Sequence, residues 1–201
     1  MSFKAVDTKK DFPKASEGQH VARCVDFIGP WEAIDDYDPK EPYPIQKVAL
    51  VWQLDEQRQD GKPFEVARDF TLSFGKKANL RRFIGMWRGK EITDAEAKAG
   101  VEIDYTGQDG FLTIEHKEKR AGGVRVEVAS VIPLPKMIAK LEPQPYTRAP
   151  YWAKRIEEDT AKSRLLQQEN LAAATKGAAN FDDFPDALED GTAKDDSDLP
   201  F

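Results

Sequence analysis

Apolar and polar positions alternate along the first 133 residues in a way that predicts five strands and one amphipathic helix. The strand-like period of two covers residues 20–28, 45–54, 64–74, 110–118 and 124–132. Between the third and fourth segments the period changes, and apolar side chains take the spacing of one helix face at Leu80, Phe83, Ile84 and Trp87. We therefore expect a helix over 76–88, a second short helix over 94–99, and a core that contains these four residues and Trp52.

Three strands, a helix and two strands follow one another in this prediction. The same order defines the OB-fold, a five-stranded barrel with a helix between its third and fourth strands. The sequence thus predicts a mainly β protein built on a five-stranded, OB-fold-like barrel. Another small antiparallel α+β domain stays open as the alternative, because the same pattern also fits one.

Proline and charge mark the segments on either side of the barrel. Pro143, Pro145 and Pro150 predict a linker, and the stretch 151–175 has the composition of a helix with few apolar positions. We expect this marginal helix to pack on the barrel or on a partner. The expected segments are an N-terminal arm (1–17), the OB-fold-like domain (18–142), the linker with its helix (143–176) and a disordered acidic tail (177–201).

Charge is unevenly distributed along the chain. The net charge of −6 comes from 30 Lys and Arg against 36 Asp and Glu. Residues 151–201 hold 6 of these cations and 12 of these acids, so the remaining 150 residues are neutral. Within the tail, eight acids face one base. A neutral body with local basic clusters is compatible with nucleic-acid binding, which the overall charge alone would argue against.

Most catalytic chemistries are excluded by what the sequence lacks. The chain has one cysteine and two histidines, so it offers neither a disulfide framework nor a His and Cys cluster for a metal. The glycine motifs that bind phosphates and the nucleophile-elbow motif are missing as well. We expect a non-enzyme without a cofactor; a nuclease that binds its metal through carboxylates alone stays open. Without an apolar run of about 18 residues or a secretory leader, we expect a cytoplasmic protein that does not enter a membrane.

Two ingredients of a single-stranded nucleic-acid site are present, namely flat side chains on which bases stack and cations that contact phosphates. Trp31, Tyr37 and Tyr43 occupy a predicted loop, 30–44, outside the core spacing. Arg68 interrupts an apolar strand face, which places it in a groove or at a barrel edge. Other cations cluster before the helix and around the last hairpin. The candidate nucleic-acid-binding residues are Trp31, Tyr37, Tyr43, Lys47, Arg68, Phe74, Lys76, Lys77, Lys117, Lys119, Arg120 and Arg125.

The end of the chain has the composition of a docking peptide. A phenylalanine ring can fill an apolar pocket while its free carboxylate pairs with a cation at the rim, and the preceding acids steer it toward a basic partner. The candidate partner-binding residues are Asp195, Asp196, Asp198, Leu199, Pro200 and Phe201. This tip resembles that of bacterial and phage single-stranded-DNA-binding proteins, with Leu199 where the bacterial pattern usually has Ile and with Ser197 inside the acidic run.

The body is also similar to phage-encoded single-stranded-DNA-binding proteins with an OB-fold. The resemblance covers roughly residues 18–136, and it rests on framework stretches at 48–54, 60–64, 70–73, 80–81, 87–89 and 130–135. It implies a role in phage replication and recombination in the host cytoplasm. It does not identify individual DNA contacts.

Together these features predict a sequence-independent protein that protects single-stranded DNA and recruits replication or recombination proteins through its tip. The tail is also expected to occupy the basic groove when DNA is absent. The alternative is an OB-fold adaptor between proteins with little direct DNA binding, which the acids of the loop 30–44 favour. The oligomeric state stays open.

Overall fold

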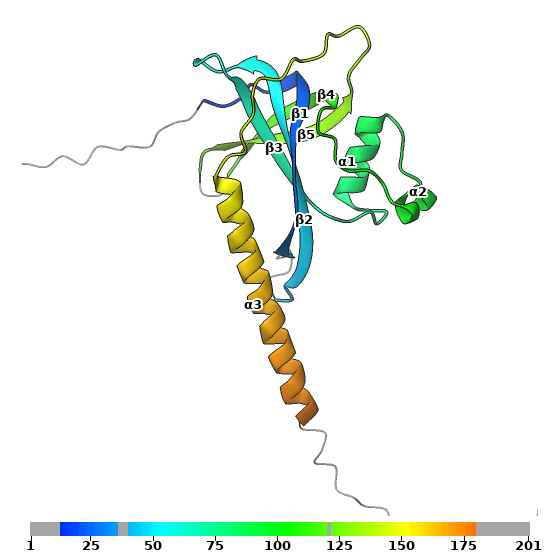
Figure 1. The fold of residues 1–201 in the computed structure, drawn as a ribbon, viewed down its shortest axis with the longest axis vertical. Helices are drawn as coiled ribbons and strands as arrows, with labels where there is room; N and C mark the ends of the chain where they lie inside the picture. The colour runs from blue at the N-terminus through cyan, green and yellow to red at the C-terminus, as the bar shows by residue number, and fades with distance from the viewer. Residues whose placement is uncertain (1–12, 36–39, 120–121, 180–201) are drawn as a thin grey trace, which may run out of the picture.

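The structure is a computed structural model that describes residues 13–35, 40–119 and 122–179. Over these residues the chain forms an antiparallel sheet, two helices between the third and fourth strands, and a long C-terminal helix (Figure 1). The strands are β1 (Gly18–Asp35), β2 (Tyr43–Gln57), β3 (Pro63–Thr71), β4 (Asp109–Glu118) and β5 (Val124–Pro133). The helices are α1 (Asn79–Arg88), α2 (Asp94–Ala99) and α3 (Tyr151–Ala179). The predicted mainly β fold and its element order are confirmed.

The five strands lie in the order β3-β2-β1-β4-β5. β1 is the central strand: it pairs with β4 from Gly18 opposite Ile114 to Arg23 opposite Asp109, and its pairing with β2 begins at Ala22 opposite Leu54. From Asp26 onward β1 pairs with β2 alone, as far as Asp35 opposite Tyr43. The β1–β2 hairpin therefore extends beyond the rest of the sheet.

The prediction of a loop over 30–44 was wrong in its first part, because β1 continues to Asp35. The ladder is irregular between Ile28 and Trp31 and then resumes, with Trp31 opposite Lys47. Gly29 occupies the irregularity with φ of 106°, and a Cβ there would lie 2.8 Å from the Lys47 carbonyl oxygen. The glycine thus allows the strand to continue past a break that reads as its end in the sequence.

The predicted closed barrel is also wrong, since the sheet stays open between its two end strands, β3 and β5. The side chain of Arg68 crosses this opening from β3. Its Nη1 donates to the carbonyl oxygen of Ala129 on β5 at 2.9 Å and also to that of Val128. A side chain, rather than a backbone ladder, joins the two strands.

One face of the curved sheet packs on α1 and encloses the main core. Four aromatic rings of this core are linked by contacts through Phe83, with Trp52 5.7 Å from Trp87 and Phe70 4.8 Å from Phe83 between ring centroids. Leu80 and Ile84 of α1 complete the apolar helix face. The expectation that Trp52, Leu80, Phe83 and Trp87 are core residues is confirmed.

The opposite face of the β1–β2 hairpin carries a second apolar cluster, which α3 covers. Trp152 of α3 is only 2% exposed and meets Trp31 of β1 edge to face, with ring centroids 6.1 Å apart. The helix then runs along the hairpin toward its tip (Figure 1). The helix expected after the proline linker is confirmed, and it packs on the sheet.

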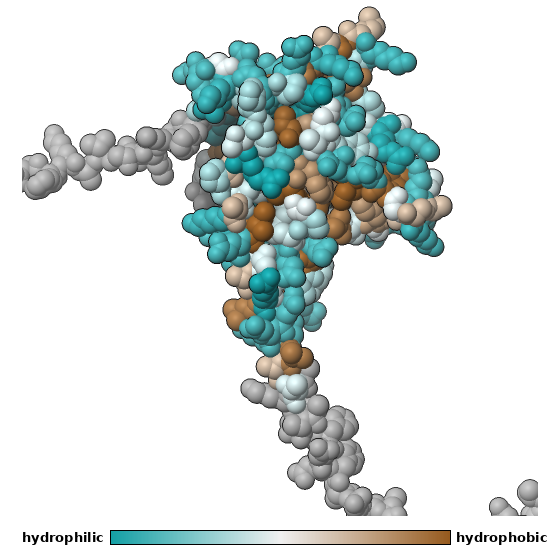
Figure 2. Space-filling view, in the orientation of Figure 1, coloured by the Kyte–Doolittle hydropathy of each residue, from teal (hydrophilic) through white to brown (hydrophobic). Residues whose placement is uncertain are grey.

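Hydrophilic residues dominate the surface that α3 presents, and apolar residues show only in small groups (Figure 2). The exposed apolar side chains of α3 include Leu165 and Leu171. Across the part of the chain that the structure describes, no helix combines the length and apolar character needed to cross a membrane.

Candidate functional site

A groove of about 870 Å³ lies where the β1–β2 hairpin, β3 and the loop before α1 converge. Its walls bring together five of the residues predicted from the sequence, although they are spread over 35 positions of the chain. These are Tyr43, Lys47, Arg68, Lys76 and Lys77. Asp35 and Asp69 add two acids to the same walls, so the groove has an excess of positive charge.

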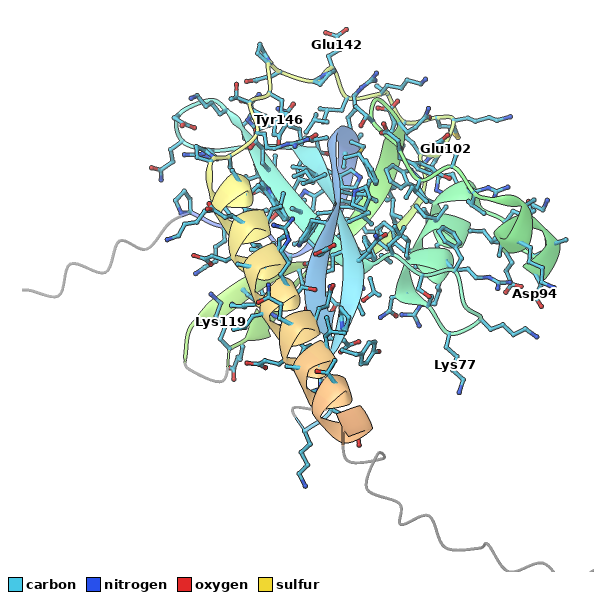
Figure 3. All side chains as sticks on the ribbon, turned by 60° about the horizontal axis from the view of Figure 1, so that its bottom comes forward. Lys77, Asp94, Glu102, Lys119, Glu142 and Tyr146 are labelled. Atoms are coloured by element: carbon cyan, nitrogen blue, oxygen red, sulfur yellow. The ribbon has the colours of Figure 1, made fainter. Side chains whose placement is uncertain are left out.

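Lys76 and Lys77 stand on the loop that leads into α1. Lys77 is exposed and extends away from the body (Figure 3), and within the described residues it forms no ion pair. Lys76 lies 3.3 Å from Asp94 but is 80% exposed, so this pair is solvated and weak. Both ammonium groups are therefore available to a phosphate.

The N-terminus of α1 opens onto the same groove. Its N-cap residue, Ala78, provides no side-chain cap, and the first turn contains no acid. The first backbone N–H groups of a helix lack partners within the helix and carry a partial positive charge. They add to the positive potential that Lys76 and Lys77 create.

Arg82 is a cation near the groove that was not among the predicted contact residues. It is exposed on the first turns of α1, hydrogen bonds to Asn79 at 3.3 Å, and lies near enough to Arg68 to lower the pKa of that residue. The helical spacing of 76–88 placed Arg82 on the polar surface of the helix. The sequence also groups Arg82 with Arg68, Lys76 and Lys77 as a cluster of cations that favours DNA, although Arg82 is not among the candidate contacts.

Arg68 forms the inner wall of the groove. Its guanidinium lies over the rings of Phe70 and Phe83, at 5.1 and 5.2 Å from their centroids. Burial is the main cause that lowers its pKa, and nearby Glu127 acts in the opposite direction. Because its Nη1 also binds two β5 carbonyls, Arg68 shapes the groove at least as much as it charges it.

A smaller cavity of about 280 Å³ continues from Arg68 and Asp69 toward β5. Arg125 lines it and donates to Glu127 at 2.9 Å, while Lys117 lies 3.1 Å from the other oxygen of the same carboxylate. Lys119 stands farther along this hairpin, on the other side of α3 from Lys77 in the view of Figure 3. Of these three cations only Arg125 lines the cavity next to the groove, and it shares the carboxylate of Glu127 with Lys117.

Tyr43 provides the exposed aromatic ring of the groove. It is 55% exposed at the start of β2, and its hydroxyl donates to Asp35 Oδ2 at 3.0 Å. That hydrogen bond, together with the charge of Asp35, raises the pKa of Tyr43. The bond leaves the ring face open and fixes its position at the rim.

Two other predicted stacking residues lie elsewhere. Trp31 is 4% exposed beneath α3, so its ring cannot receive a base in this structure, and the expectation that it stacks does not fit its position. The reason is that it belongs to β1 and faces Trp152. Phe74 is half-buried and packs against the main core. Tyr37, Arg120 and the six tip residues fall outside the described residues.

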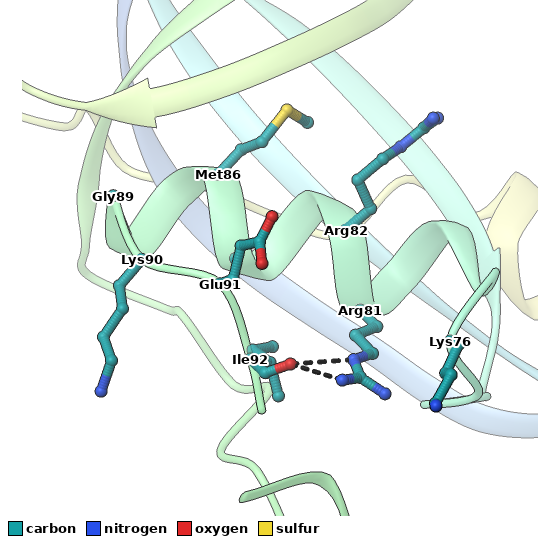
Figure 4. A pocket seen from close by; sticks show the side chains of 9 residues that line it. Lys76, Arg81, Arg82, Met86, Gly89, Lys90, Glu91 and Ile92 are labelled. Carbon is teal, nitrogen blue, oxygen red and sulfur yellow. Dashed lines mark hydrogen bonds between the residues drawn. The ribbon is translucent and has the colours of Figure 1, made fainter. Parts of the chain in front are cut away.

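A second cavity, of about 480 Å³, lies on the other side of α1 and shares Lys76 with the groove (Figure 4). Arg81 points toward it and donates through Nε to the carbonyl oxygen of Ile92 at 3.0 Å, through Nη1 to that of Phe74, and through Nη2 to Asp94. All its nitrogens are occupied, so Arg81 fixes the chain after α1. Arg82 points away from this arrangement in Figure 4.

The histidines and the cysteine take structural positions. His20 lies 3.0 Å from the Ser16 carbonyl oxygen and His116 lies 2.8 Å from that of Ala15, so both fix the segment before β1. Burial raises the pKa of Cys24 to about 12, which keeps its thiol protonated. Among the described residues, no group of three or more His, Cys, Asp and Glu is arranged to hold a metal ion.

Comparisons with protein-family models, curated proteins and solved structures find no match to this chain.

Proposed function

We propose that this protein binds single-stranded DNA without regard to sequence, in the groove between the β1–β2 hairpin and the loop before α1. The observation that carries the proposal is the exposed ring of Tyr43 at the rim of a groove walled by Lys47, Arg68, Lys76 and Lys77. Single-strand sites need a stacking surface for bases and cations along the path of the phosphates. The groove supplies both within one continuous surface.

The architecture supports the same proposal. The strand order, with β1 central and β3 and β5 at the ends, and the helix between the third and fourth strands are those of an OB-fold in which β3 and β5 do not pair. OB-folds bind oligonucleotides on the face of strands 2 and 3 and with the adjoining loops. The groove lies at one of these loops, next to β3. We assign this chain to that architecture as part of the proposal.

The acidic tip completes the proposed function. Its aspartates, its terminal ring and its carboxylate suit a basic pocket with an apolar floor on a replication or recombination protein. We propose that the body protects the strand in the cytoplasm while the tip recruits that protein. Cofactors and catalysis have no part in this function.

The second candidate is an adaptor that binds proteins rather than DNA. It is favoured by the carboxylates beside the cations, since Asp35 and Asp69 line the groove and Glu127 engages two cations of the hairpin. These acids reduce the positive potential that a DNA strand would meet. Direct measurement of DNA binding separates the two candidates.

The test is a fluorescence-anisotropy titration of labelled oligo-dT at two salt concentrations, with duplex DNA as competitor. We expect binding that weakens as salt rises and that duplex does not displace. The substitution Tyr43→Ala should weaken binding about tenfold, the effect of one lost base stack, whereas Tyr43→Phe should leave the affinity unchanged.

A matched pair of cation variants controls for net charge. Lys77→Gln removes a cation of the groove, and Lys98→Gln removes one from α2, away from the groove. Only the first should reduce affinity and the steepness of its salt dependence. If neither the full chain nor a chain without residues 177–201 binds oligo-dT at low salt, the proposal is wrong and the adaptor function takes its place.

A further inference from the structure

Asp69 is an acid in the middle of a basic site. It projects from β3 and lines both the groove and the cavity toward β5. Two cations from different elements contact its Oδ2 atom, Arg155 of α3 through Nη2 at 2.8 Å and Lys47 of β2 through Nζ at 3.9 Å. The closer contact comes from the C-terminal helix.

Arg155 is held in place before any ligand arrives. Its guanidinium lies 5.3 Å from the centroid of the Trp152 ring, and its Nε is 3.8 Å from Asp159 Oδ2. That same oxygen accepts a hydrogen bond of 3.1 Å from Trp31 Nε1. A chain of contacts thus runs from β1 through α3 to β3, and it directs Arg155 at Asp69.

We propose that α3 sets the charge of the groove, because Arg155 neutralises Asp69 and thereby leaves Lys47 to the ligand. This inference rests on the proposed binding of DNA in the groove. Without Arg155, the carboxylate would repel a phosphate and would hold Lys47, whose contact with it is long and weak, as its remaining cation. Arg155 is therefore a positioning residue that acts through Asp69, and α3 is a part of the binding site that touches no base.

The first test compares Arg155→Gln with Lys154→Gln by oligo-dT anisotropy at low salt. Both variants remove one positive charge from the same turn of α3. Lys154 is 78% exposed and pairs with Glu158 of the same helix, not with a residue of the groove. We expect Arg155→Gln to weaken binding roughly three- to tenfold, the effect of one uncompensated charge about 6 Å from a phosphate in a groove open to water, with an effective dielectric constant of about 40 to 80. Lys154→Gln should change affinity less than twofold.

The second test asks whether the effect passes through Asp69. Asp69→Asn should bind more tightly than wild type, the double variant Arg155→Gln/Asp69→Asn should bind close to wild type, and Arg155→Gln should therefore weaken binding less in the Asp69→Asn background than it does alone. If Arg155 served only to pack α3, its loss would weaken binding equally in both backgrounds, and the inference would be overturned. Equal effects of Arg155→Gln and Lys154→Gln would overturn it as well.

The two proposals fail in different ways. Absence of wild-type binding to oligo-dT removes the proposed function and this inference with it. If the wild type binds oligo-dT but Asp69→Asn does not reduce the effect of Arg155→Gln, the proposed function stands and only the role of α3 is wrong.

Discussion

At the residue scale, Arg68 shows how a single side chain can take over a task of the backbone. Its guanidinium lies over two aromatic rings of the core and donates to β5 carbonyls across the open side of the sheet. A charged group in such a position is stable only because hydrogen bonds compensate the loss of water. Its contribution to stability can therefore be separated from its charge.

Arg68→Lys keeps the positive charge but cannot bind two carbonyls while covering two rings. We expect the free energy of unfolding to fall by about 2 kcal/mol, the value of charged hydrogen bonds left unmade. Urea denaturation followed by circular dichroism measures this. Arg125→Lys is the control, because Arg125 is 58% exposed and its ion pair with Glu127 is solvated, and its effect should stay within about 0.5 kcal/mol. Equal losses in the two variants would contradict the role given to Arg68.

The limits of sequence-based prediction at this scale follow from distance along the chain. Tyr43, Lys47, Lys76 and Lys77 could be selected because residue type and local pattern suffice for exposed cations and aromatics. The contact of Arg155 with Asp69 spans 86 positions, and no local pattern pairs them. Trp31 was misassigned because an aromatic residue after Gly-Pro suggests a loop, whereas its partner, Trp152, lies 121 positions later.

At the scale of elements, alternation predicted the five strands and the spacing of apolar residues predicted α1, because each buries one face against a common core. The closed barrel failed for a different reason. Closure of the barrel depends on the distance between β3 and β5 in the curved sheet. The pattern of apolar and polar residues does not predict that distance. The sequence predicted a helix over 151–175 but left open whether it packs on the sheet or on a partner. Its apolar contact comes mostly from only two residues, Trp152 and Ile156, which is too few to decide between the two from the pattern.

The short helix α2 offers a test of its capping at acid pH. Glu96 accepts a hydrogen bond from the Thr93 backbone N–H and a second from Arg88, and these lower its pKa to about 2. Because the folded pKa lies below the usual value of 4.5, the stabilisation is present above pH 4.5 and is lost as pH falls through 2. Amide chemical shifts of residues 94–99 should therefore report fraying over this interval.

Glu96→Gln provides the control for that titration. Glutamine retains the reach of the capping box but takes up no proton. Its amide shifts over 95–99 should change much less between pH 5 and pH 2 than those of wild type, and the remaining change should centre on Asp94, whose pKa Arg81 and Lys76 also lower. The same pH response in the variant and the wild type would rule out Glu96 as the titrating group.

At the scale of the whole molecule, charge is divided between a neutral body and an acidic end. The segment 177–201 carries eight acids and one base, and we expect it to compete with DNA for the groove of modest positive charge. Such competition acts through long-range attraction and therefore weakens in salt. Under the proposed function, this division predicts a tail that both recruits a partner and competes with the DNA.

Removal of 177–201 should tighten oligo-dT binding several-fold at low salt and have little effect at high salt. Anisotropy titrations of the full and shortened chains measure this. Phe201→Ala is the matched control, because it alters the tip and keeps every acid, so DNA affinity should not change. If the shortened chain binds no more tightly than the full one, the tail does not compete for the groove.

The open side of the sheet has one more consequence, which concerns solubility. An end strand with unpaired backbone groups is a template for strands of other molecules, and sheets left open in this way tend to aggregate edge to edge. Arg68 occupies carbonyls of β5 and places an inward-pointing charge at the β3 edge, which a neighbouring strand would have to bury. We therefore expect the arginine that joins the two edges also to hinder pairing between copies of this chain through them.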